Sequence, residues 1–408
     1  MLINQRRPKK GYALLLFIVL WHYFFSSSFV LRLNPKIFWP TIFAIALGIL
    51  LMKREVLQGT ELTLFKFLSV GFLACFLSAD AWTSIINDVY FFVYLGVAAM
   101  IGRNITTIKV MKTTLGFCVV HLICIYIQVF VPNAYKSIIL PLLPSYSHAD
   151  ILYQMTYNAS FYGFTVQTCI AAMYMTIGAI CAAIFAKHSK RSITKILYIV
   201  LVALFLTGVL FTTRRGSLLA LCLVLAYIYF DTSGGKFSKI VLLLLGIAFL
   251  LSVGVDWIPG MQGLLDKFDR LSGNMMNGRQ TIWGNALTNF WNYPLFGYGV
   301  GNASLAGGGA LIDNAYLAIL VERGLIGSVI WFIPIIWTFI KTYSKKKHAS
   351  DMDNIAQDFS LYIQLLFVIM SMMENYFGQA LAMFFYYMAV LCEDFTRMRG
   401  NYEIDKSN

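Results

Sequence analysis

Long apolar runs separated by short polar connections dominate the pattern along this chain. Each run is about 17 to 22 residues long, which is the length that an α-helix needs to cross roughly 30 Å of hydrocarbon. Because backbone polar groups must be satisfied inside a bilayer, each run predicts a spanning helix. The pattern predicts about twelve spans, near residues 11–31, 37–52, 62–78, 83–101, 113–131, 162–186, 195–211, 216–230, 238–255, 324–340, 358–373 and 378–393.

The composition excludes a soluble globular protein. Of the 408 residues, 59% are hydrophobic and 12% are charged, and the mean hydropathy is +0.70, whereas soluble domains are roughly 45–50% apolar. We therefore predict an all-α polytopic membrane protein with a single membrane domain over residues 1–408. The first apolar run is long and lacks a cleavage site, so we expect it to remain as an anchor.

The positions of lysine and arginine predict the orientation. Threading the spans with the N-terminus inside puts about 22 of the 32 basic residues on the cytoplasmic side. Both termini are then cytoplasmic. The net charge of +13 comes from short clusters next to the spans, which favours contact with membrane lipids over binding to nucleic acid.

Two of the predicted outside connections are much longer than the rest. They cover residues 132–161 and 256–323. Long connections often carry function, so we expect the site in the larger of the two.

The larger loop contains an amphipathic helical pattern from Arg279 to Trp291. Trp283 lies four residues after Arg279, so the two side chains share one face of that helix. Two interpretations stay open: an interfacial anchor, because tryptophan settles at headgroup depth, or a substrate-binding face.

A glycine-rich run, PLFGYGVGNA, follows this helix and includes Gly297, Gly299 and Gly301. Glycines allow the backbone to approach a ligand closely, and exposed N–H groups form anion-binding concavities. A flexible loop is the other interpretation of the same run.

The sequence Asp313-Asn314-Ala315-Tyr316 then opens another helical stretch. Asp313 is well suited to cap that helix, because its carboxylate accepts from free N–H groups. A carboxylate on the outer surface could instead take a proton from a hydroxyl of a substrate.

Arg214 and Arg215 lie at the predicted outer end of the seventh span, where basic residues are uncommon. Arginines near a span often mark function, although a lipid headgroup would also satisfy them. The five histidines are scattered along the sequence and no CxxC pair is present, so we expect no metal and no cofactor.

Three motifs together resemble the O-antigen ligase and O-antigen polymerase superfamily of bacteria. They are TGVLFTTRRGSLLAL, GRQTIWGNALTNFWNYPLFGYGVGNA and DNAYLAILVERGLIG, in this order within residues 205–330. The resemblance implies a multispan enzyme of the cytoplasmic membrane that acts on sugars carried by undecaprenyl diphosphate, without metal or nucleotide.

The resemblance also implies roles for individual residues. Arg215 matches the arginine of the seventh-span motif, Arg279 and Trp283 match the R-x-x-x-W of the loop helix, and Asn314 and Tyr316 match the N-x-Y. Arg214 lies beside the matched arginine and is an equal candidate. In the ligases a histidine typically precedes the asparagine, whereas this chain has Asp313 there, which favours a polymerase.

The resulting expectation is an inverting, metal-independent polymerase of lipid-linked repeat units for O-antigen, capsule or exopolysaccharide. Asp313, Arg215 and Arg279 are the expected catalytic residues, and Arg214, Trp283, Asn314, Tyr316, Gly299 and Gly301 are expected to bind the substrate. A ligase and a lipid-linked sugar flippase or transporter are the alternatives. A chain-length regulator and a flippase are candidate partners.

Overall fold

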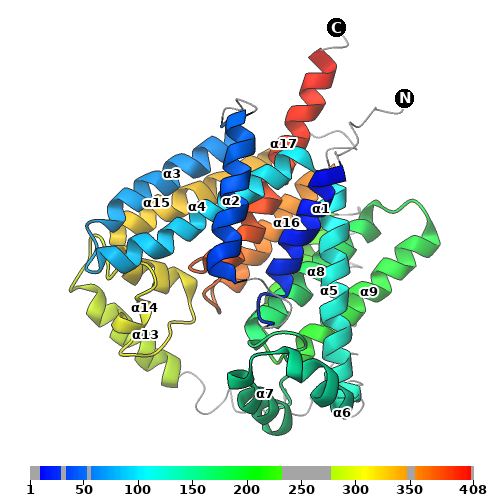
Figure 1. The fold of residues 1–408 in the computed structure, drawn as a ribbon, viewed down its shortest axis with the longest axis horizontal. Helices are drawn as coiled ribbons and strands as arrows, with labels where there is room; N and C mark the ends of the chain where they lie inside the picture. Colours follow the sequence, from blue (N-terminus) through cyan, green and yellow to red (C-terminus); the bar gives the residue numbers. More distant parts are fainter. Residues whose placement is uncertain (1–9, 29–33, 53–56, 232–276, 347–353, 406–408) are drawn as a thin grey trace. The chain divides into compact units, whose positions relative to one another are not determined.

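The computed structural model describes residues 10–28, 34–52, 57–231, 277–346 and 354–405 (Figure 1). Within these ranges the regular elements are all helical, which confirms the predicted class. The chain forms two compact units: unit 1 comprises residues 1–23, 33–113 and 281–408, and unit 2 comprises residues 24–32 and 114–280.

Each predicted span that falls in the described residues overlaps a helix. Five of these helices are long and apolar enough to cross a membrane, and shorter apolar helices accompany them. The chain is thus a multi-pass membrane protein by the length and composition of its helices. The ninth predicted span, 238–255, and residues 256–276 of the predicted loop lie outside the described residues, and the total of twelve spans stays a prediction.

Unit 1 is a bundle in which α4 packs along α17 and also contacts α2 and α3. The helix α15 lies against α3 and α16, and α16 against α17. The elements are α1 (Lys10–Phe24, to Tyr23 in this unit), α2 (Pro35–Met52), α3 (Gly59–Cys75), α4 (Ala81–Asn104), α13 (Asn277–Phe290, from Thr281), α14 (Ala303–Ala306), α15 (Ala315–Lys346), α16 (Asn354–Met370) and α17 (Ala380–Asp405).

Buried polar side chains link three helices of this bundle. The hydroxyl of Tyr386 lies 2.9 Å from that of Thr338 and donates to Oε1 of Gln364 at 3.2 Å. The amide of Gln364 donates to Thr342, whose hydroxyl donates to Glu393 at 2.7 Å. Such interhelical hydrogen bonds stabilise membrane bundles, where burial of apolar surface contributes little.

The helix α15 is broken near its start. Gly324 has φ 64° and ψ −172°, so α15 consists of a short helix from Ala315 and a longer one after the kink. A side chain at Gly324 would be strained, and its Cβ would lie 2.3 Å from the carbonyl carbon of Leu295. The sequence had predicted a span beginning at this glycine.

Unit 2 is built around α8, which packs against α9 and α10. The predicted outside segment 132–161 is mostly helical, in short pieces. The elements are α5 (Thr107–Phe130, from residue 114 in this unit), α6 (Pro132–Ala134), a π-helical turn (Tyr135–Ile139), a 3₁₀ turn (Leu140–Leu142), α7 (Ser145–Tyr157), α8 (Thr168–His188), α9 (Ser192–Phe211) and α10 (Arg215–Asp231).

Candidate functional site

The turn at residues 313–316 is fixed to the rest of unit 1 by hydrogen bonds. The side-chain oxygen of Asn314 accepts from the backbone N–H of Leu317 at 3.1 Å. Its amide group donates to the carbonyl of Met372 at 3.1 Å, and the backbone N–H of Ala315 donates to the carbonyl of Ser371 at 2.9 Å. The turn is therefore held on the segment that follows α16.

Asn314, and not Asp313, provides the N-cap of α15, because the helix begins at Ala315 and the capping oxygen belongs to Asn314. The capping role considered for Asp313 is thus taken by its neighbour. Asp313 is half-buried and directly precedes the cap.

Tyr316 points into unit 1. Its hydroxyl donates to the carbonyl of Val368 at 2.9 Å, and its ring stacks on that of Phe332 with centroids 5.4 Å apart. Asn314 and Tyr316 together fix the backbone on both sides of Ala315. Both side chains thereby set the position of Asp313.

The glycine run 297–301 has a defined backbone conformation. Gly299 and Gly301 have φ of +103° and +91°. A Cβ at Gly299 would lie 2.7 Å from the carbonyl oxygen of Asp80, and one at Gly301 would lie 2.2 Å from the side-chain nitrogen of Asn87. Glycine is required here for close packing against α4 and the residue that caps it. The binding of substrate by these two glycines stays a prediction.

The same run pairs with the kink of α15 through main-chain bonds. Tyr298 N–H donates to the carbonyl of Val321 at 2.9 Å, and Gly299 N–H donates to that of Glu322 at 2.8 Å. After the kink, Leu325 N–H donates to the carbonyl of Pro294 at 2.8 Å. These bonds fix the glycine run to the helix that begins at the 313–316 turn.

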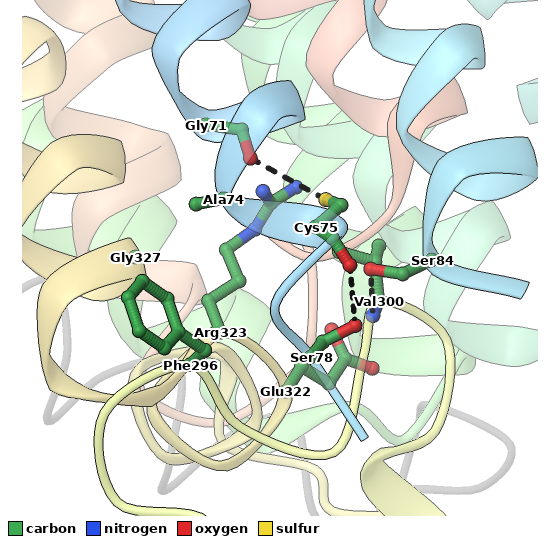
Figure 2. Close-up of a pocket in the computed structure, with 10 residues that line it drawn as sticks. All are labelled: Gly71, Ala74, Cys75, Ser78, Ser84, Phe296, Val300, Glu322, Arg323 and Gly327. Carbon is green, nitrogen blue, oxygen red and sulfur yellow. Dashed lines mark hydrogen bonds between the residues drawn. The ribbon is translucent and has the colours of Figure 1, made fainter. Parts of the chain in front are cut away.

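A cluster of buried charged groups lies beneath the glycine run, around a small cavity (Figure 2). Arg323 forms an ion pair with Asp88 of α4, and the two side chains are 5% and 0% exposed. The guanidinium of Arg323 also lies 4.1 Å from the ring centroid of Trp331. A carboxylate oxygen of Glu322 accepts from the backbone N–H of Ala303 at 3.3 Å.

The cavity between these groups has a volume of about 10 Å³, which is enough for one water molecule. Figure 2 shows Arg323 reaching from α15 toward Gly71 and Cys75 of α3. Sequence reasoning missed this cluster. The signal was present, since Asp88 and Arg323 are ionisable residues in or beside apolar runs, where such residues are uncommon.

In unit 2, Arg214 ends the turn between α9 and α10, and Arg215 begins α10. The Nε of Arg214 donates to the hydroxyl of Thr168 at 2.6 Å. Thr213 has a left-handed backbone with φ +57°, which is rare for a β-branched residue. Its hydroxyl lies 2.9 Å from that of Ser160, and Phe161 N–H donates to the carbonyl of Phe211 at 3.0 Å. The turn is therefore strained and held from both sides, a combination common at functional sites.

Arg215 and Arg279 interact electrostatically within unit 2. Arg215 is the first residue of α10 and precedes the predicted span 216–230. Burial lowers the pKa of the Arg215 guanidinium, and the positive charge of Arg279 lowers that pKa further. Two like charges near a helix N-terminus create a field that attracts anions.

Trp283 packs within unit 1, on a small apolar cluster beneath the loop helix. That cluster includes Ala286, Ala306, Ile312 and Ala318, all buried. Leu287, four residues after Trp283 on the same helix, is 51% exposed. Trp283 thus anchors α13 to the segment that leads into the 313–316 turn.

The predicted site residues fall into two sets. Arg214, Arg215 and Arg279 lie in unit 2. The second set lies in unit 1 and comprises Trp283, Gly299, Gly301, Asp313, Asn314 and Tyr316. The members of each set share a compact unit, and their assembly into one site stays a prediction.

Comparison with known families identifies a match within the chain. Residues 199–332 match the family described as O-antigen ligase. The matched segment is about a third of the chain, and it contains each of the predicted site residues. It confirms the resemblance to the O-antigen ligase and polymerase superfamily. No curated protein matches the chain.

Proposed function

We propose that this membrane protein, with its O-antigen ligase segment, polymerises oligosaccharide repeat units carried by undecaprenyl diphosphate. The reaction takes place on the outer face of the bacterial cytoplasmic membrane. The observation that carries the proposal is the match of residues 199–332 to the O-antigen ligase family. Within that segment the positive charges of Arg215, at the start of α10, and Arg279 act on each other. That arrangement suits a diphosphate, because guanidinium groups form charge-assisted and bidentate bonds to phosphate oxygens.

The proposed reaction is glycosyl transfer with inversion. A hydroxyl of one lipid-linked repeat unit attacks the anomeric carbon of the growing chain, and a new C–O bond forms. The bond from that carbon to the diphosphate breaks, and its electron pair leaves with undecaprenyl diphosphate. The hydroxyl proton passes to the carboxylate of Asp313, which acts as the general base.

The arginines stabilise the leaving group in this scheme. Negative charge develops on the diphosphate as the anomeric bond breaks, and the guanidinium groups of Arg215 and Arg279 bind that charge. A donor that is in place for the transition state typically contributes about 10² to 10³ in rate. Arg214, which is oriented by Thr168, binds the same group.

The turn 313–316 and the loop around it position the acceptor. Asn314 and Tyr316 bond to backbone carbonyls after and within α16, and these bonds hold the backbone next to Asp313. Trp283, Gly299 and Gly301 shape the adjoining surface, where the sugar binds. No metal or nucleotide takes part.

The choice of polymerase over ligase rests on Asp313, which stands where ligases typically have a histidine. A ligase would use the same lipid-linked donor and transfer the finished glycan to lipid A core or another acceptor. A flippase or transporter would require neither Asp313 nor Arg279 in a reaction. It is the second alternative.

The length of surface polysaccharide tests the proposal. Arg279→Ala and Asp313→Ala are compared with a complete deletion on a gel, at matched membrane levels. Collapse of long chains to a single repeat on the lipid anchor supports the polymerase. Loss of attachment with persistent long lipid-linked chains indicates a ligase, and unchanged polysaccharide in the deletion contradicts both enzymes.

A further inference from the structure

An apolar groove opens in unit 2 between α5 and α9. Its volume is about 360 Å³, and its walls include Ile123, Tyr126, Ile127 and Phe130 of α5 and Leu204 of α9. The hydroxyl of Tyr126, the polar atom of that side chain, is hydrogen-bonded to Thr207. The groove therefore offers an almost purely apolar surface.

The groove leads to the arginine turn. The rings of Tyr126 and Phe130 contact the ring of Phe211, with centroid distances of 5.7 and 6.2 Å. Phe211 is the last residue of α9, and Arg214 follows three residues later. A cationic turn thus stands at the end of an apolar groove, all within unit 2.

We infer that this groove holds the polyisoprenoid tail of the lipid diphosphate, with its head at Arg214 and Arg215. The inference rests on the proposed function, because it names where the tail of that substrate binds. Two neighbouring guanidinium groups match the charge of a diphosphate better than that of the single phosphate of a phospholipid. A groove of this volume takes a few branched isoprene units of one chain.

Photo-labelling tests the inference without requiring catalysis. The full chain is purified in detergent and irradiated with a polyprenyl diphosphate that carries a diazirine within its first few isoprene units. Labelling is expected on the peptides that contain Ile123 and Leu204. It should fall at least about tenfold with excess unlabelled polyprenyl diphosphate, and also when Arg214 and Arg215 are both replaced by alanine.

Groove-filling variants provide the second readout. Ile123→Trp and Leu204→Trp should raise KM for a long-chain lipid-linked donor about tenfold, because displacing two buried methylene groups has an effect of that size. The KM for a donor with one or two isoprene units should stay unchanged. Leu197→Trp is the matched control, because Leu197 is 64% exposed on the same helix and lies outside the groove.

Three results would overturn the inference. These are equal displacement of the label by phosphatidylglycerol, labelling centred on Leu197 and not on Leu204, and a KM for long donors that the groove variants leave unchanged. If the probe labels the groove but the same protein transfers no sugar, the inference is upheld and the proposed enzyme is contradicted.

Discussion

Breaking the ion pair between Asp88 and Arg323 should destabilise the protein strongly. Both side chains are almost fully buried, so solvent screening is weak and a single replacement leaves a buried charge uncompensated. Such a loss typically costs about 3–5 kcal/mol. We expect Asp88→Asn near the lower end of that range, because Trp331 still lies against the charge of Arg323.

Arg323→Met should lower the free energy of unfolding by an amount near the upper end of the same range, about 5 kcal/mol. One carboxylate oxygen of Asp88 is bonded to Arg323, and the other has no hydrogen-bond partner among the described residues. Removing the guanidinium therefore leaves a buried carboxylate with no compensating charge in this cluster. The double variant, Asp88→Leu with Arg323→Met, should recover to within about 1 kcal/mol of the wild type, because apolar groups of similar volume replace both charges.

The assay is the free energy of unfolding of the purified protein, from a titration with SDS in mixed micelles followed by tryptophan fluorescence. Asp231→Asn is the control, because Asp231 pairs with Lys187 at 2.6 Å in a partly exposed position and such pairs contribute about 0–1 kcal/mol. The reasoning is refuted if the single variants lose less than about 1 kcal/mol, or if the double variant is as unstable as Arg323→Met.

Three further predictions concern the loop and its contacts. Gly301→Ala should lower the unfolding midpoint more than Gly309→Ala. Both glycines have φ +91°, but only a Cβ at position 301 would clash with Asn87. Equal losses would show that backbone strain alone causes the effect. Asn314→Ala should lower the free energy of unfolding by about 1 kcal/mol in the same SDS titration, because the cap is lost. Asn314→Asp should keep the cap and much of that stability. An equal loss in both variants would contradict the capping role. The pKa of Asp80 is lowered by hydrogen bonds from the start of α4 and from the loop. The contribution of Asp80 to stability is therefore complete above pH about 4 and is lost as the pH falls through the lowered pKa. Thermal melts at a series of pH values should show a steeper loss of stability in acid for the wild type than for Asp80→Asn, and identical curves would refute this prediction.

The helices of this protein could be predicted from apolar run length, because only a helix satisfies its backbone within one spanning segment. The predicted span 324–340 begins at Gly324, which is the residue at which α15 is kinked. The packing of Gly299 and Gly301 against α4 could not be predicted, because those contacts join residues that are more than 200 positions apart.

The site could be predicted only in part, for a similar physical reason. Arg214 and Arg215 were found because charge is uncommon at the outer end of a span. The sequence offered Asp313 as the cap of α15 or as a catalytic residue, whereas Asn314 supplies the cap. Aspartate and asparagine cap helices about equally well, so the sequence does not distinguish between these adjacent residues. The partner of Arg323 lies on a distant helix, and pattern analysis of single segments does not identify such pairs.

Release of undecaprenyl diphosphate by the purified protein tests the central claim most directly. The protein is incubated with a single lipid-linked repeat unit, and released lipid diphosphate and new glycosidic linkages are counted together. We expect one lipid diphosphate per linkage, lipid-linked chains of increasing length, and rates at least about 100-fold lower for Arg215→Ala and Arg279→Ala. Wild-type protein that forms no linkage but moves the lipid across a bilayer, or arginine variants as fast as the wild type, would contradict the account.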